Sequence, residues 1–225
     1  MNILNYESLP MGGFGGLKEK RFVTDTRAFG SHKEPHAIEG LGNFVYLADA
    51  NFFPRGQTGM HKHKEVDVIS VMVEGQISHA GSLEHGQALT PGMVQVQRAG
   101  GEGFSHNEIN PDDTENQMIQ LWVLPEQRGE PAGYKTYLPA TGERRAIYGG
   151  NPSQTERFHS HTMIDVAQLT PGQLLQQDGE VMLYLAQGQG IIGKTDIPAR
   201  SLVHSENILF KALAESQVIV IYLNK

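Results

Sequence analysis

Short apolar runs separated by turn residues recur along the whole chain, and none of them keeps a helical period over several turns. Residues 66 to 73 form a run rich in β-branched side chains that leads to Gly75, which predicts a buried strand closed by a turn. Residues 44 to 48 (FVYLA) and 118 to 124 (MIQLWVL) predict further strands. Residues 93 to 98 (MVQVQR) alternate, so one face of this strand should be buried and the other should be wet or line a cavity. The pattern predicts an all-β sandwich or barrel with few short helices.

The second half of the chain repeats the first half weakly. Residues 183 to 189 (LYLAQGQ) match residues 71 to 76 (VMVEGQ) in kind when Gly188 is paired with Gly75. An internal repeat of a β-domain is therefore predicted, and the chain is long enough for two small domains that each bury a core.

The segment between the two halves differs from both. Residues 125 to 158 contain four prolines, several glycines and scattered charge, which indicates a connection between domains. We therefore expect an N-terminal domain over residues 1 to 130, and a linker followed by a C-terminal domain over residues 131 to 225.

Composition limits the partners that the chain can have. Lys and Arg number 18 against 25 Asp and Glu, a formal net charge of −7, so no basic face for phosphate is evident and direct nucleic-acid binding is not expected. The N-terminus has no charged segment followed by an apolar one, and no later run approaches the length of a membrane span. We expect a soluble, cytoplasmic protein without membrane contact, and the absence of Cys fits that compartment.

Two pairs of metal-binding side chains have the spacing of a strand. His61 and His63 are two residues apart, as are His106 and Glu108, and residues i and i+2 of a strand project from the same face. Three imidazoles and one carboxylate suit a first-row divalent metal, because imidazole is a borderline ligand and a carboxylate offsets part of the ionic charge. Unrelated surface groups and a purely structural metal are the alternatives, but a zinc site made of thiolates is excluded because the chain has no Cys.

The motifs around these pairs resemble those of the pirin family, which belongs to the cupin superfamily. The likeness is specific over about residues 44 to 138 and continues more loosely to the C-terminus. The matching segments are His61-x-His63, Val73-Glu74-Gly75, Thr90-Pro91-Gly92, Ala99-Gly100 through Gly103, His106-x-Glu108 and Gln120-Leu121-Trp122.

The resemblance implies a bicupin, with two β-barrel domains of the double-stranded β-helix type. It implies that the first barrel holds one divalent ion, iron(II) or alternatively zinc, nickel, manganese or another such ion, through His61, His63, His106 and Glu108. The second barrel of pirin-like proteins carries no metal. Some bacterial members are similar to quercetin 2,3-dioxygenases, whereas eukaryotic relatives are linked to transcriptional co-regulation.

The chain departs from the family pattern between its first two ligands and the strand that follows. Lys62, Lys64, Glu65 and Val66 replace the usual residues, and Asp67 replaces the usual Glu. Many other cupins take their carboxylate ligand from this last position, so the side chain competes with Glu108 as fourth ligand. We favour Glu108, because Asp is one methylene shorter, and we expect Asp67 to orient an imidazole.

The internal repeat predicts that the second domain has lost the ligands. The register places Leu174 at the position of His61 and Gln176 at that of His63. We expect the other histidine motifs, at residues 159 to 161 and 204 to 206, to be surface or loop residues. Apolar side chains should fill the second barrel, among them Leu183, Leu185, Ile219 and Ile221.

Two functions of different class follow. The first is a metal-dependent dioxygenase acting on a small flavonol-like aromatic substrate such as quercetin, in which Glu108 is the catalytic residue and takes the substrate's hydroxyl proton as general base. The second is a non-enzymatic, metal- or redox-dependent regulator that binds a protein partner. An apolar cavity beside the metal favours the enzyme, and a filled cavity with an exposed apolar patch favours the regulator.

Overall fold

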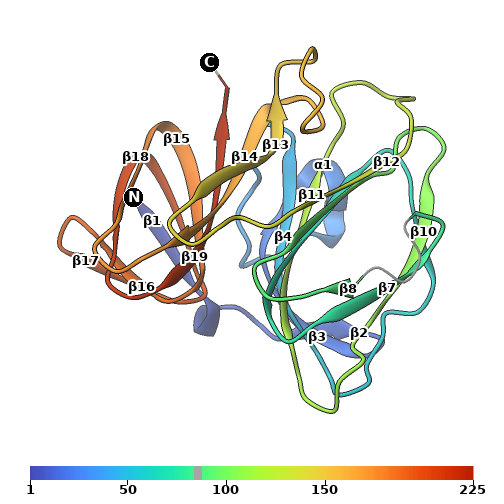
Figure 1. Cartoon of the computed structure of the whole chain (residues 1–225), viewed down its shortest axis with the longest axis horizontal. Helices are drawn as coiled ribbons and strands as arrows, with labels where there is room; N and C mark the ends of the chain where they lie inside the picture. Colours follow the sequence, from blue (N-terminus) through green and yellow to red (C-terminus); the bar gives the residue numbers. More distant parts are fainter. Residues whose placement is uncertain (84–87, 225) are drawn as a thin grey trace. The chain divides into compact units, whose positions relative to one another are not determined.

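The computed structural model describes residues 1 to 83 and 88 to 224 (Figure 1). The chain forms two compact units, one of Leu9–Leu138 and the other of Pro139–Lys225 together with Met1–Ser8. Helix is a minor component of the described residues, as predicted. The helical segments there are α1 (Thr26–Phe29), η1 (Tyr6–Ser8) and η2 (Gly30–His32).

The first unit contains two antiparallel sheets. Both consist of short strands joined by turns, so the all-β prediction is confirmed for this unit. The larger sheet has the order β12 (Gly133–Tyr137), β9 (Val94–Arg98), β6 (Asp67–Glu74), β11 (Gln117–Val123), β4 (Phe44–Phe52), β3 (Leu17–Thr24) and β2 (Gly12–Phe14). The smaller sheet has the order β5 (His61–His63), β10 (Phe104–Ile109), β7 (Ile77–Gly81) and β8 (Ala88–Leu89).

The central strands of the larger sheet are buried on both faces. In β6 every residue from Asp67 to Val73 is buried, and Gly75 then adopts a φ of 71°, which suits glycine in a turn. Leu17, Phe52, Met72 and Met118 from four strands share one apolar cluster. This packing fixes the register of β3, β4, β6 and β11, and with it the side chains that face the interior.

Strand β9 has no wet face at its glutamines, so this one of the two predicted alternatives, a wet face or a face on a cavity, is wrong. Gln95 and Gln97 are fully buried, like the valines with which they alternate. Gln95 accepts a hydrogen bond of 2.9 Å from the hydroxyl of Tyr134 on the neighbouring strand β12. The polar positions of this strand are therefore interior groups.

The second unit is built on one large sheet. Its strands are mostly longer than those of the first unit, and the first strand of the chain joins them. The order is β13 (Arg144–Gly150), β14 (Ser160–Leu169), β19 (Ser216–Leu223), β15 (Leu174–Gln187), β18 (Ser201–Ala212), β16 (Gln189–Ile192) and β17 (Thr195–Pro198), with β1 (Asn2–Asn5) paired to β18.

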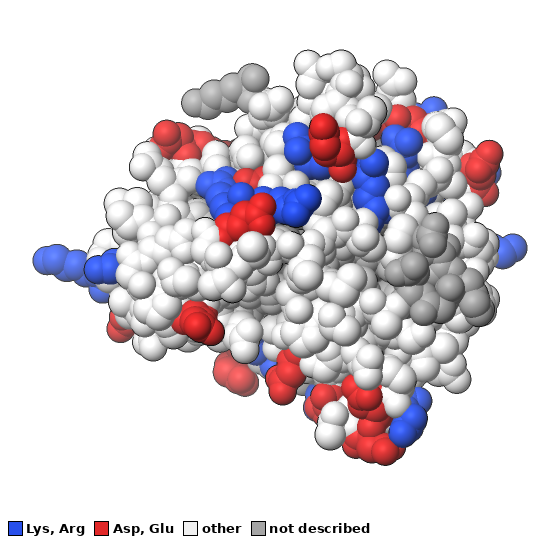
Figure 2. Space-filling model, in the orientation of Figure 1, with Lys and Arg blue, Asp and Glu red and all other residues white. Residues whose placement is uncertain are grey.

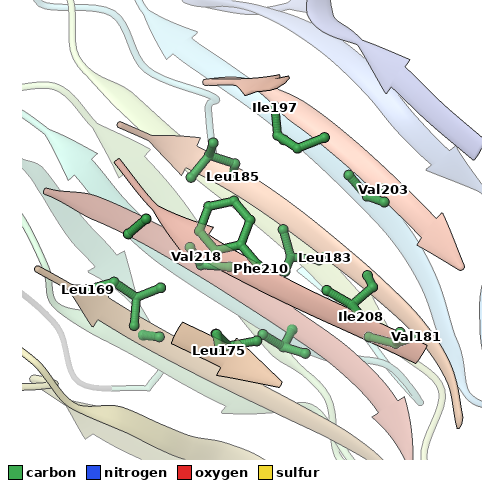
Figure 3. Packing of buried hydrophobic residues seen from close by; sticks show 13 residues of the cluster. Leu169, Leu175, Val181, Leu183, Leu185, Ile197, Val203, Ile208, Phe210 and Val218 are labelled. Atoms are coloured by element: carbon green, nitrogen blue, oxygen red, sulfur yellow. The ribbon is translucent and has the colours of Figure 1, made fainter. Parts of the chain in front are cut away.

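Figure 3 shows the apolar core of this unit, in which side chains from β14 to β19 interdigitate around Phe210. Leu183 and Leu185 belong to this core, as the sequence predicts. The residues that β19 contributes are Val218 and Val220, and not the predicted Ile219 and Ile221. The isoleucines are buried on the other face of the strand, because successive side chains alternate.

The boundaries of the units differ from those expected at residues 130 and 131. Strand β12 lies beyond the expected boundary but pairs with β9 of the first unit. Strand β1 lies at the start of the chain but pairs with β18 of the second unit, with Asn2 opposite His204. Pairing between distant segments therefore sets the division of the chain.

Figure 2 shows acidic and basic side chains interspersed on the face of the molecule that it presents. A helix long and apolar enough to cross a membrane is absent from the described part of the chain.

Candidate metal centre

Three neighbouring strands of the smaller sheet carry the candidate ligands. Strand β10 lies between β5 and β7, so that His106 is opposite His61 on one side and Glu108 is opposite His79 on the other. Because alternate residues of a strand share a face, these side chains point to the same side of the sheet. Strand pairing thus brings the two i, i+2 pairs predicted from the sequence together in one cluster.

The Nε2 atoms of three histidines converge. The Nε2 atom of His106 lies 2.9 Å from that of His61 and 3.1 Å from that of His63. The Nδ1 atom of His61 lies 2.9 Å from the carbonyl oxygen of Gly59, so Nδ1–H donates there and the lone pair remains on Nε2. Imidazole lone pairs that face one another at this distance form a donor set for a cation.

Glu108 and His79 extend the cluster inside the sheet. Their side chains are buried, and the Nε2 atom of His79 lies 3.4 Å from Oε1 of Glu108. The His79 ring stacks on that of His106 with centroids 5.6 Å apart. Ligand atoms of His61, His63 and His106 lie within 4.8 Å of one another, and so do those of His79, His106 and Glu108. The carboxylate therefore lies beside the three histidines.

Several buried polar atoms of the cluster lack a hydrogen-bond partner within the described part of the chain. They are Nδ1 and Nε2 of His79, Nδ1 of His106 and Oε1 of Glu108. Buried groups of this kind are normally satisfied in folded proteins, so their concentration here indicates a site for a ligand. The donor set fits a divalent metal ion.

Burial sets the charge of these groups. It lowers the pKa of His106 to about 3 and, together with the neighbouring His61, the pKa of His63 to about 4. Burial alone would raise the pKa of Glu108, but contact with His79 and the electrostatic effect of His106 and His61 outweigh it and lower that pKa to about 2. Near neutral pH His63 and His106 are therefore neutral and Glu108 is ionised, which are the forms that bind a metal.

The lowered histidine pKa values predict a pH dependence of the metal-free protein's stability. In the unfolded chain, His63 and His106 bind a proton near pH 6.5, whereas in the folded chain they do so only near pH 4 and pH 3. As pH falls below 6.5 the unfolded state binds more protons, so the free energy of unfolding should decrease. The slope approaches about 1.4 kcal/mol per pH unit for each imidazole.

Urea unfolding in the presence of a chelator at pH 7 and pH 5 would measure this loss. A variant with His63→Gln and His106→Gln should lose less stability over the same interval. Equal losses in the two proteins would contradict the assignment to these histidines.

A narrow pocket of about 40 Å³ adjoins the cluster. Its walls come from alternate residues of β3, β4 and β11 in the larger sheet, with His61, His63 and Glu108 at one side. The other lining residues are mainly apolar: Phe14, Leu17, Glu19, Tyr46, Ala50, Met118, Gln120 and Trp122.

Trp122 connects the pocket wall to the histidines. Its ring lies edge-on to His63, with centroids 5.7 Å apart, and packs on Tyr46 at 4.6 Å and on Phe29 at 5.8 Å. The structure gives Trp122 both a place in an aromatic stack and a face on the pocket.

Other predicted or missed residues can now be placed. Asp67 is buried at the start of β6, but it does not line this pocket and is in neither ligand group found among the described residues. In the second unit, the Nε2 atom of His204 lies 3.0 Å from Oε1 of Glu180 on a partly exposed surface. His79 was missed. The only signal for it in the sequence was its i, i+2 spacing from Ile77.

Comparison with protein families and sequences gives consistent matches. The sequence profile of the family described as Pirin matches residues 23–123. A protein named "Putative quercetin 2,3-dioxygenase", from Zymomonas mobilis, is 25% identical over 96% of this chain and 95% of its own length. A quercetin 2,3-dioxygenase from Escherichia coli is 32% identical, over 49% of this chain and 47% of that protein.

Comparison with solved structures concerns the fold. The crystal structure of the bacterial pirin YhhW from Escherichia coli, in complex with nickel(II), has a TM-score of 0.83. The match covers 99% of this chain and 98% of that one at 18% identity. The similarity extends over both units, which confirms the predicted bicupin fold.

Proposed function

We propose that the chain is a member of the pirin family and a metal-dependent dioxygenase that acts on flavonol-like aromatic substrates such as quercetin. The observation that carries the proposal is the convergence of three imidazole Nε2 atoms, with a buried carboxylate beside them, on a pocket with aromatic walls. Relatives named quercetin 2,3-dioxygenases support the substrate class.

One divalent ion would be held by His61, His63, His106 and Glu108. We expect iron(II), with nickel, zinc and manganese as alternatives, because nitrogen and oxygen donors of this kind accept each of these ions. Four protein ligands leave two positions of an octahedral ion for other molecules. The nickel(II) in the solved bacterial pirin supports the choice of a divalent ion.

The residues of the pocket would divide the chemistry between them. A bound divalent ion supplies Lewis-acid chemistry, which lowers the pKa of a substrate hydroxyl. Glu108 would accept the hydroxyl proton on a carboxylate oxygen, while the His79 ring, whose Nε2 atom lies 3.4 Å from Oε1, would help to hold this carboxylate in place. The rings of Trp122 and Tyr46 would pack against the aromatic substrate and exclude water from it.

The size of the pocket sets a condition on this proposal. A volume of about 40 Å³ is below the roughly 300 to 1,000 Å³ of sites that enclose drug-sized ligands. A flavonol would therefore enter only if side chains at the mouth move aside. Phe14 fits this role, because it is 48% exposed and lies on the three-residue edge strand β2.

The cavity also bears on the alternative function. A filled cavity together with an exposed apolar patch would favour a regulator that binds a protein partner. The largely apolar pocket at the histidines favours the enzyme by this criterion. The role as a regulator would lead only if the test of activity fails.

The test is oxygen uptake with quercetin by protein loaded in turn with iron(II), nickel(II) and manganese(II). We expect uptake that depends on metal and stops when a chelator removes it, because a bound divalent ion would supply the Lewis acid that makes the substrate hydroxyl acidic. Protein without added metal is the control. No uptake with any flavonol and any of the metals would overturn the dioxygenase proposal.

A further inference from the structure

The pocket contains a second carboxylate that the proposed metal site does not use. Glu19 lies on β3, two residues after Leu17, and both side chains line the same narrow cavity as the histidines. The Glu19 side chain is 3% exposed, and the remaining wall beside it is mainly apolar. A buried acid on the wall of an apolar cavity is uncommon unless specific partners hold it.

Two neighbours fix the position of this carboxylate. Oε1 of Glu19 accepts a 2.7 Å hydrogen bond from Nε of Arg21 and lies 2.7 Å from Nη2 of the same guanidinium. Oε2 accepts a 3.0 Å hydrogen bond from the hydroxyl of Tyr46. A carboxylate has about four acceptor sites, so these three donors leave Oε2 able to accept one more hydrogen bond.

The surroundings indicate what kind of group could use that site. Tyr46 packs against Trp122, and Trp122 contacts His63, so an aromatic wall runs from the carboxylate to the histidines. The Nε1 atom of Trp122 is buried and has no hydrogen-bond partner in the described chain. The cavity therefore combines three features: the cluster of histidines with Glu108, an aromatic wall, and the Glu19 carboxylate, which can accept a further hydrogen bond.

We propose that Glu19 determines specificity by accepting a hydrogen bond from a second hydroxyl group of the aromatic substrate, distinct from the hydroxyl directed at the metal. The substrate class is thus an aromatic enol that carries at least one further phenolic hydroxyl. Anionic substituents would be repelled by Glu19, which gives selection against carboxylated rings. The inference rests on the proposed function for its substrate class.

A purely structural role explains the arrangement less well. A buried ion pair contributes little net stability, because removing both charges from water offsets their attraction. Arg21 is also 34% exposed at its side chain, so its charge does not require a buried partner. A substrate hydroxyl that donates to the remaining acceptor site of Glu19 would explain why this carboxylate lies on the cavity wall.

Binding can be measured separately from turnover, because Trp122 is the only tryptophan in the chain and lines the pocket. Quenching of its fluorescence, in nickel(II)-loaded protein without dioxygen, would give Kd for quercetin and for 3-hydroxyflavone. The second compound keeps the enol but lacks the other hydroxyls. A hydrogen bond to a charged group contributes about tenfold or more in affinity, so the parent should bind quercetin at least about tenfold more tightly.

The variant Glu19→Gln should reduce this preference to about threefold or less, because the amide keeps the shape of the side chain but loses its charge. Glu115→Gln is the matched control, since Glu115 pairs with Lys18 at 2.8 Å and does not line the pocket. This control should keep the parent's preference.

Equal affinity of the parent for the two flavonols would overturn the proposal, and that measurement needs no variant. An unchanged preference in folded Glu19→Gln protein would also overturn it, as would the absence of quenching by any flavonol. A preference that depends on Glu19, in a protein that consumes no oxygen, would support the binding role and refute only the dioxygenase proposal.

Discussion

Replacing His61 and His106 together by alanine is expected to abolish metal binding almost completely. The two Nε2 atoms lie 2.9 Å apart, and the double change removes two of the four proposed ligands. Only His63 and Glu108 would then remain as ligands, and the ion would have two more open coordination positions than in the parent. Elemental analysis after dialysis against trace metal should give about one equivalent for the parent and close to none for the variant.

A matched control comes from the second unit. His159→Ala together with His204→Ala also removes two imidazoles, and the proposal that this unit holds no metal predicts unchanged metal content. Circular dichroism would show that both double variants are folded. Parent-like metal content in the variant of His61 and His106 would refute the assignment, and metal loss in the control would refute the proposal of a metal-free second unit.

The candidate ligands could be predicted from the sequence because their geometry is local. An i, i+2 pair projects from one face of any strand, whatever the rest of the fold. His61 with His63, and His106 with Glu108, needed only the correct strand assignment. That the two pairs meet depends on the pairing of β5 with β10, and it was inferred from their shared chemistry.

The missed features depend on contacts between distant segments. His79 reaches Glu108 only because β7 pairs with β10 in one particular register, which a single histidine in an apolar strand does not reveal. The same limit applies to Gln95, whose polar side chain is buried because Tyr134 on β12 supplies a donor. A periodic pattern distinguishes two faces of a strand, but it does not say what covers each face.

The core of the second unit shows a smaller error of the same kind. Leu183 and Leu185 were assigned correctly, but Ile219 and Ile221 were assigned to the face that Val218 and Val220 occupy. These two valines and two isoleucines of β19 are all apolar and buried, so their pattern contains no alternation by which to choose a face. The boundary between the units was likewise displaced, because β1 and β12 each pair with a strand far away in the chain.

The variant Glu108→Gln is expected to lower turnover of a flavonol by about a hundredfold or more, as is typical when a general base is lost. The amide keeps nearly the same shape and one carbonyl oxygen for the metal, so metal affinity should fall only moderately. The charge is the property that changes, because the pKa of Glu108 is about 2 and the parent side chain is ionised at neutral pH.

The ionised state of Glu108 also explains why the change to glutamine should reduce turnover. Because Glu108 is ionised at neutral pH, it could accept the proton of a substrate hydroxyl that a bound divalent ion would make more acidic. Steady-state oxygen uptake and metal content would be measured on the same samples, with Glu102→Gln as the control because Glu102 is an exposed acid next to β10. If the parent cleaves quercetin and fully metal-loaded Glu108→Gln protein cleaves it equally fast, Glu108 is a ligand only. Asp67, buried at the start of β6, would then be the next carboxylate to test as the base.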